Sequence, residues 1–164
     1  FPGARDSAEA RSRMVALFSA GIRSILCLQP EDETGSGGLP FPPYDAIWRE
    51  VAEERGEAVL WARHPIPDMG VPGQPEMQVV LDAIDGTARP AYVHCWGGHG
   101  RTGTVAGCWL VRHGVMPEGA FARIHEARAH DTQLRYFSSP QTKGQRGFVR
   151  RWSEFEPPAL PPKP

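Results

Sequence analysis

The sequence predicts an α/β fold, a three-layer sandwich in which helices flank a central, mostly parallel sheet of four to five strands. Two observations support this prediction. Short segments rich in branched apolar residues alternate along the chain with longer segments whose apolar residues recur at helical spacing. The 164 residues also suffice for one domain with one substantial core, which we assign to residues 1–155.

The first half of the chain predicts two helices and two strands, separated by glycine and proline. The expected order is a helix capped by Asp6 or Ser7 and ended by Gly21, a buried strand over 22–28, a loop over 31–43, a helix over 44–55, a short strand over 58–62, and a loop over 63–72. The last of these loops contains Asp68 directly after Pro67.

The second half predicts a third strand and four helices. The expected order is a helix starting at Pro75 and ended by Gly86, a strand over 91–94, an apolar helix over 101–113, a helix from Pro117 to about 130, and a last helix that starts at 139–140. Because strand 91–94 precedes the most apolar helix, we expect it to be central in the sheet. Residues 156–164 contain five prolines, and we expect this tail to be disordered.

The charge balance excludes several classes of function. The chain has 18 basic and 19 acidic residues, so a broad nucleic-acid-binding surface is not expected. No apolar run approaches the roughly 20 residues that span a bilayer, and no signal peptide is visible. Three cysteines cannot form a disulfide framework, and Cys27 and Cys108 lie in apolar segments as expected of core residues. We therefore expect a monomeric cytoplasmic protein without a membrane span.

One segment concentrates groups that can bind an anion. It follows strand 91–94 and reads His94-Cys95-Trp96-Gly97-Gly98-His99-Gly100-Arg101-Thr102-Gly103. Glycine lets a loop curl with its N–H groups pointing inward, and the helix that follows adds its own free N–H groups and dipole. We expect the backbone of residues 96–100 to surround a phosphate and Arg101 to bind it in bidentate fashion.

The same positive surroundings should favour the thiolate of Cys95, which makes it the candidate nucleophile. Thr102 follows Arg101, and its hydroxyl could donate a hydrogen bond to the sulfur and help it leave. His94 precedes the nucleophile, and we expect it to fix the loop geometry through hydrogen bonds rather than to transfer protons.

Taken together, His-Cys-x5-Arg-Thr-Gly between a strand and a helix resembles the signature of the protein tyrosine phosphatase superfamily. His64-Pro65-Ile66-Pro67-Asp68 resembles the general-acid loop of its compact dual-specificity members, and Gln141-Thr142-x-x-Gln145 resembles the glutamine loop of its tyrosine-specific branch. The resemblance implies hydrolysis through a phosphocysteine, with no cofactor and no metal. It implies that Asp68 is the general acid and then the base, and that Gln141 and Gln145 orient the attacking water.

The resemblance leaves the substrate open. We expect phosphotyrosine, phosphoserine or phosphothreonine proteins. The alternatives are a non-protein polyanion, such as an inositol phosphate, a phosphoinositide or an RNA end, and an inactive phosphate-binding module. His99 could add charge for a second phosphate only when protonated, and otherwise it fills space in the loop.

Two other interpretations of this loop are weaker. Gly98-x-Gly100-x-x-Gly103 matches a dinucleotide-binding fingerprint, but Pro117 begins a helix where that fold needs a second strand. A metal site from His94, Cys95 and His99 lacks a fourth ligand and the spacing of known zinc motifs.

Overall fold

The three predicted strands form one parallel sheet in the computed structural model, which describes residues 1–35 and 37–153. The strands are β1 (Ser24–Cys27), β2 (Leu60–Arg63) and β3 (Ala91–His94), in the order β2-β1-β3. Ser24 is in register with Leu60 on one side and with Ala91 on the other. The prediction of a mostly parallel sheet is confirmed, whereas the predicted four to five strands are three within the described residues.

The prediction that strand 91–94 is central is wrong, because β1 lies between the other two strands. All four residues of β1 are buried, whereas three of the four residues of β3 are only partly buried. The apolar helix after β3 was a misleading guide to strand order. This helix packs mainly against other helices, so its burial does not depend on a central place for β3.

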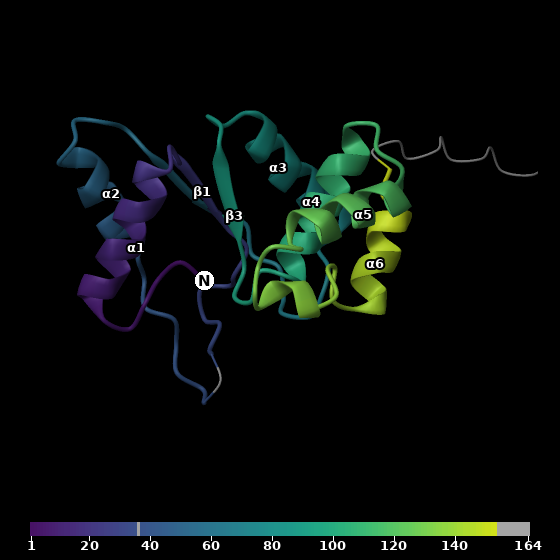
Figure 1. The fold of residues 1–164 in the computed structure, drawn as a ribbon, viewed down its shortest axis with the longest axis horizontal. Coiled ribbons are helices and arrows are strands. Elements are labelled where there is room, and N and C mark those ends of the chain that lie inside the picture. The colour runs from purple at the N-terminus through teal and green to yellow at the C-terminus, as the bar shows by residue number, and fades with distance from the viewer. Residues whose placement is uncertain (36, 154–164) are drawn as a thin grey trace, which may run out of the picture.

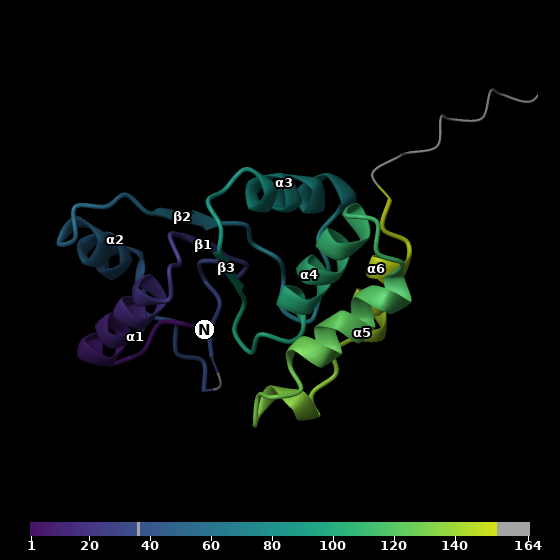
Figure 2. The ribbon, with the colours of Figure 1, turned by 45° about the horizontal axis from the view of Figure 1, so that its top comes forward.

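Helices cover both faces of the sheet, which confirms the predicted three-layer architecture (Figures 1 and 2). The first face is covered by α1 (Ser7–Ser19) and α2 (Asp45–Glu53), and the second by α3 (Gln74–Asp85), α4 (Arg101–Arg112), α5 (Pro117–Ala127) and α6 (Lys143–Arg150). A 3₁₀ turn, η1 (Leu134–Tyr136), lies between α5 and α6. Tyr92 packs with the first group and Val93 with the second, as the alternation along a strand requires.

The helix ends follow the signals in the sequence. Asp6 is the N-cap of α1, since its carboxylate accepts a hydrogen bond from the amide of Glu9 at 2.8 Å. Gly21 follows α1 with φ +86°, a value that favours glycine. The last helix starts at Lys143 rather than at 139–140, because Thr142 is its N-cap and forms a capping box with Gln145.

No helix among the described residues is long and apolar enough to cross a membrane. The predicted disordered tail, 156–164, lies outside the described residues. The assignment of 1–155 to a single domain stays a prediction.

Candidate active site

The residues that the sequence predicts to carry out the chemistry lie near the C-terminal end of β3. Cys95 follows β3 and is 2% exposed, and the loop after it leads into α4 at Arg101. The Thr102 hydroxyl donates a hydrogen bond to the Cys95 sulfur at 3.2 Å. The adjoining pocket has a volume of about 410 Å³ and is lined by Asp68, Met69, Cys95, Trp96, Gly97, His99, Gly100, Arg101 and Gln141. Most of the predicted site residues therefore lie around one pocket at the carboxyl end of the sheet, where ligands bind in open α/β folds.

Glycine is favoured at two places in this loop. Gly98 has φ +73°, which disfavours any residue with a Cβ. A Cβ on Gly100 would lie only 3.0 Å from Oε1 of Gln141 and 3.2 Å from Nε2 of Gln145. Gln141, before α6, and Gln145, in its first turn, can therefore pack directly on the backbone of the phosphate loop.

Arg101 is buried, and two carboxylates hold it. Glu33 accepts hydrogen bonds from both terminal nitrogens of the guanidinium, one of them at 2.8 Å, and Asp68 lies 2.9 Å from Nη2. Burial acts against the charge of Arg101, but the Glu33 hydrogen bonds and the charges of Cys95, Glu33 and Asp68 outweigh it and raise the pKa. Within the described residues the buried Nε has no hydrogen-bond partner, so one donor remains for a substrate oxygen.

Glu33 is the site residue that the sequence did not reveal. It lies in the loop over 31–43, where nothing in the local pattern marks it as functional. Burial tends to raise the pKa of Glu33, but hydrogen bonds from Arg101 and Gln29 dominate and lower it, so the group is a carboxylate. Its position shortly after β1 was the available signal, because the carboxyl ends of neighbouring parallel strands lie at the same edge of a sheet.

Replacing Glu33 by glutamine should lower kcat/KM about tenfold, because a bidentate charged contact that orients Arg101 is worth about 1.5 kcal/mol or more. Asp32→Asn is the matched control, since Asp32 is an exposed acid one residue away. Steady-state kinetics on an aryl phosphate measures both variants. Equal rates for Glu33→Gln and Asp32→Asn would contradict a role for Glu33.

His94 lies beneath the loop and is held by two neighbours. Its Nδ1 lies 3.0 Å from the carbonyl oxygen of Cys95, and its Nε2 contacts the Tyr44 hydroxyl. A carbonyl only accepts, so Nδ1 carries the proton and Nε2 accepts from Tyr44. Burial lowers the pKa of His94 to about 4, which leaves the ring neutral at physiological pH. These contacts support the predicted structural role of His94 and use both ring nitrogens.

His94 should make the fold sensitive to mild acid. The folded state resists protonation of His94 and the unfolded chain does not, so the stability it contributes is complete above pH 6.5 and is lost as the pH falls towards about 4. The full loss in the free energy of unfolding is up to about 3 kcal/mol. We expect the melting temperature to fall by about 5 °C or more between about pH 7.5 and about pH 5.

A His94→Gln variant should lose most of this dependence on pH. Burial also lowers the pKa of His64, so His64→Gln is the control for the remaining slope. Identical pH profiles of melting temperature for the wild type and His94→Gln would contradict the burial of a neutral imidazole.

The two predicted glutamines take different positions. Gln141 lines the pocket. Gln145 is fully buried, where its Oε1 accepts from the amides of Gln141 and Thr142 and its Nε2 donates to the carbonyl of Gly70 at 3.0 Å. Gln145 therefore links α6 to the loop that carries Asp68, and Gln141 has the more direct access to a water in the pocket.

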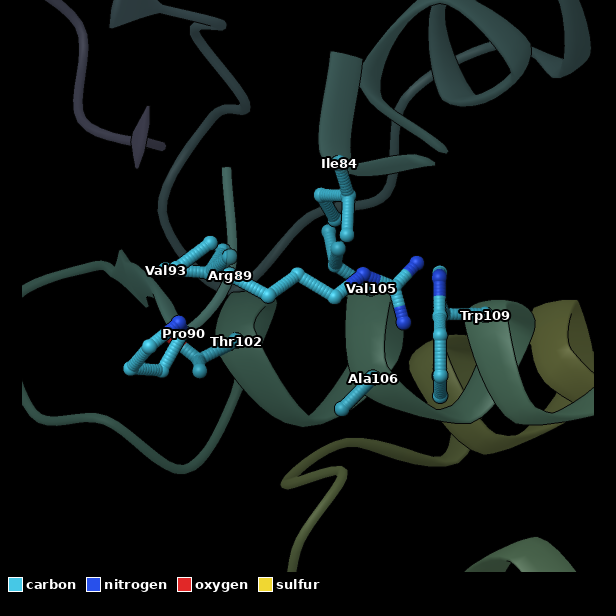
Figure 3. A pocket seen from close by; sticks show the side chains of 9 residues that line it. Ile84, Arg89, Pro90, Val93, Thr102, Val105, Ala106 and Trp109 are labelled. Atoms are coloured by element: carbon cyan, nitrogen blue, oxygen red, sulfur yellow. The ribbon is translucent and has the colours of Figure 1, made fainter. Parts of the chain in front are cut away.

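A larger groove lies beside this site (Figure 3). Its volume is about 590 Å³, and it is lined by Ile84, Arg89, Pro90, Ala91, Val93, Thr102, Val105, Ala106 and Trp109. Arg89 reaches across it to the ring of Trp109, 5.1 Å from the ring centroid. The lining is apolar apart from Arg89 and Thr102 and contains no nucleophile or carboxylate, so the chemistry belongs to the smaller pocket. Among the described residues no cluster of three or more His, Cys, Asp or Glu side chains could hold a metal ion.

Comparison with known proteins points to the same chemistry. The family model described as Swiss Army Knife protein, DSP-PTPase phosphatase domain (PTP-SAK), matches residues 4–141. This range includes Asp68, Cys95 and Arg101 and ends at Gln141, four residues before Gln145.

Individual relatives match parts of the chain. "Uncharacterized protein MJECL20" of Methanocaldococcus jannaschii is 43% identical over 54 residues, which cover 31% of this chain and 37% of that protein. "Putative tyrosine phosphatase 067L" of Invertebrate iridescent virus 3 is 38% identical over 105 residues, which cover 56% of this chain and 43% of that protein. The chain thus spans less than half the length of either relative.

A similar fold occurs in the crystal structure of kinase associated phosphatase (KAP), with a TM-score of 0.71 and 20% sequence identity. The similarity covers 91% of this chain and 80% of that chain.

Proposed function

Since the chain belongs to the PTP-SAK family of DSP-PTPase phosphatase domains, we propose that it hydrolyses phosphate monoesters through a phosphocysteine. The predicted resemblance to the protein tyrosine phosphatase superfamily is thereby confirmed. The observation that carries the proposed activity is the position of Arg101, which contacts the carboxylate of Asp68 and begins the helix next to the Cys95 loop. Nucleophile, phosphate ligand and proton donor thus share one pocket.

In the first step the Cys95 thiolate attacks phosphorus, and the bond from phosphorus to the ester oxygen breaks. Asp68 gives its proton to the leaving oxygen, and the backbone amides of residues 96–100 with Arg101 hold the three remaining oxygens. Asp68 is half exposed, so it can reach a leaving group at the mouth of the pocket.

In the second step water attacks the phosphocysteine, and the bond from sulfur to phosphorus breaks. Asp68, now a carboxylate, takes the proton of the water, and Gln141 orients that water. The sulfur leaves as a thiolate that accepts the hydrogen bond of Thr102, so the enzyme returns to its starting state. Apart from the substrate and the water, every group that reacts or binds in this cycle belongs to the chain itself.

We propose phosphotyrosine, phosphoserine or phosphothreonine proteins as substrates. The name of the viral relative supports a protein substrate, as does the name of the matching family. The pocket also has an apolar mouth, with Met69 and Trp96 both exposed. The three cysteines are buried and unpaired, which supports a reducing compartment such as the cytoplasm.

One of the alternative functions is an inactive module that only binds phosphate, and measured turnover separates this module from the enzyme. We expect the enzyme to hydrolyse p-nitrophenyl phosphate at the same rate in the presence and absence of a chelator. No turnover, or loss of turnover on chelation, would overturn the proposed mechanism.

Asp68→Asn should slow hydrolysis of alkyl phosphates by roughly 10² to 10⁴-fold, the usual contribution of a positioned acid. The effect on kcat/KM for p-nitrophenyl phosphate should be much smaller, because this ratio reports the formation of the phosphocysteine and the leaving oxygen needs little protonation. Values of kcat/KM on both substrates test this, with Asp82→Asn as control because α3 places Asp82 in another element. An equal loss of kcat/KM on both substrates, or no loss on either, would show that Asp68 is not the acid.

A further inference from the structure

Trp96, the residue after the nucleophile, has a large exposed side chain at the active-site pocket. It lines the pocket together with Met69, and both residues are exposed. Large apolar side chains in the lining of a pocket are the usual contacts for the apolar part of a ligand. The mechanism proposed above gives the indole of Trp96 no role, so its place in the pocket calls for another one.

The loop that follows β1 holds this indole in place. The ring of Phe41 packs edge-on against the ring of Trp96, with centroids 5.5 Å apart and planes at 63°. The same loop contributes Glu33, whose carboxylate binds Arg101. One loop therefore contacts the phosphate loop at two points, the guanidinium and the indole.

The loop folds back on itself directly before Phe41. Thr34 and Pro40 form an antiparallel bridge, and the amide of Gly35 donates to the carbonyl oxygen of Leu39 at 2.9 Å. A Cβ on Gly35 would lie 3.4 Å from Cζ of Phe41, so the ring packs close to this backbone. These contacts fix the position of Phe41, and Phe41 in turn supports one side of the indole.

We infer that Trp96 is a specificity-determining residue, whose indole contacts an aromatic ring attached to the ester oxygen of the substrate, and that Phe41 positions the indole. This inference rests on the proposed phosphatase function and names the ester that the site selects. That ester is an aryl phosphate, which in a protein substrate is phosphotyrosine rather than phosphoserine or phosphothreonine.

The proposed reaction determines which part of the substrate the indole can contact. The Cys95 thiolate attacks phosphorus in line with the leaving oxygen, so the ester oxygen points away from the sulfur. Asp68 protonates that oxygen, and the atoms bonded to it therefore lie beside Asp68, among lining residues that include Met69 and Trp96. A tyrosine ring begins at the ester oxygen, whereas serine and threonine place a single carbon between that oxygen and the peptide backbone. Only the aromatic ester brings a flat apolar surface to this part of the pocket.

The pocket is suited to such a ring in size and in chemistry. Its volume of about 410 Å³ falls within the range of about 300 to 1,000 Å³ that is common for ligand sites. An aromatic ring gains stability from a second ring beyond the burial of its area, and the sulfur of Met69 also favours contact with a ring. Arg101 and Asp68 serve the phosphate and the ester oxygen, so the two large apolar side chains remain for the group beyond them.

The test measures the binding of two peptides of one sequence, one with phosphotyrosine and one with phosphoserine. Calorimetry on the Cys95→Ser variant gives both dissociation constants without any effect of the different leaving groups. We expect the phosphotyrosine peptide to bind about tenfold more tightly. Adding Trp96→Ala should reduce this ratio to less than about twofold, and adding Trp96→Phe should keep most of it, because phenylalanine also has a flat ring.

Phe41→Ala should lower the same ratio, and Phe41→Tyr should restore it, because tyrosine retains the ring. Leu39→Ala is the matched control, since Leu39 is an exposed apolar residue of the same loop. Together with Trp96→Ala, Phe41→Ala should cause no further loss, because the two residues act through one contact. The affinity for inorganic phosphate should stay unchanged in all these variants, because the loop amides and Arg101 are untouched.

Equal binding of the two peptides by Cys95→Ser would overturn the inference. Additive losses in the double variant would also overturn it, as would a loss of affinity for both peptides and inorganic phosphate by the same factor. Turnover of p-nitrophenyl phosphate by the wild type separates the inference from the function on which it rests. A phosphotyrosine preference in binding without this turnover would contradict the proposed function and leave the role of Trp96 standing. Turnover with equal binding of the two peptides would do the opposite.

Discussion

Replacing Cys95 by serine should reduce turnover by roughly 10⁴-fold or more, the scale seen when a covalent nucleophile is removed. Serine keeps the shape of the side chain, but its hydroxyl remains protonated at neutral pH and attacks phosphorus poorly. Phosphate or vanadate should still bind, because the backbone amides of the loop and Arg101 are unchanged. Steady-state kinetics measures the loss, and inhibitor titration or calorimetry measures the binding.

Cys27→Ser and Cys108→Ser are the controls for this experiment. Both thiols are buried, and burial raises their pKa values, so neither is a competent nucleophile. We expect both control variants to retain turnover in proportion to the fraction that folds. Undiminished activity in Cys95→Ser, or the same loss per folded molecule in Cys108→Ser, would remove Cys95 from the mechanism.

Arg101→Lys should lower kcat/KM by roughly 10³-fold, within the range of arginines that stabilise a transferring phosphoryl group. The guanidinium contacts Glu33, Asp68 and the carbonyl oxygen of Ile66 at once, and its Nε–H has no partner among the residues that the structure describes. The ammonium group of lysine lacks the planar fork of nitrogens and cannot make the same set of contacts. It would also leave part of the Glu33 carboxylate without its partner.

Arg150→Lys is the matched control, since Arg150 pairs with Glu118 on the surface and is distant in sequence from the loop. Circular dichroism shows whether the Arg101 variant still folds. A rate for Arg101→Lys within tenfold of the wild type would contradict a role for the guanidinium in holding the phosphate.

The sequence allowed the fold to be predicted where local signals and tertiary structure agree. Asp6, Gly21 and Pro75 mark helix ends through backbone chemistry that acts within a few residues. The strand order depends on packing between distant segments. The order was therefore predicted wrongly from the apolar helix after β3, although the three strand segments themselves were found.

The candidate site likewise contains residues that local signals predict and residues that depend on contacts between distant segments. Cys95, Arg101 and Thr102 lie within one short loop, where spacing alone predicts a phosphate cradle. Asp68 was found only through its resemblance to a family motif, and the structure places it 2.9 Å from Arg101. Glu33 carries no local signal, because it acts through Arg101, which is far away in the sequence.

The most direct test of the mechanism is to trap the phosphocysteine. Asp68→Asn should still form it from p-nitrophenyl phosphate, whose leaving group needs no acid, but should hydrolyse it slowly because the base is missing. After an acid quench, intact-protein mass spectrometry should show the added mass of one phosphoryl group, and peptide mapping should place it on Cys95. Continued turnover by Asp68→Asn with no phosphorylated cysteine at any quench time would contradict the covalent mechanism.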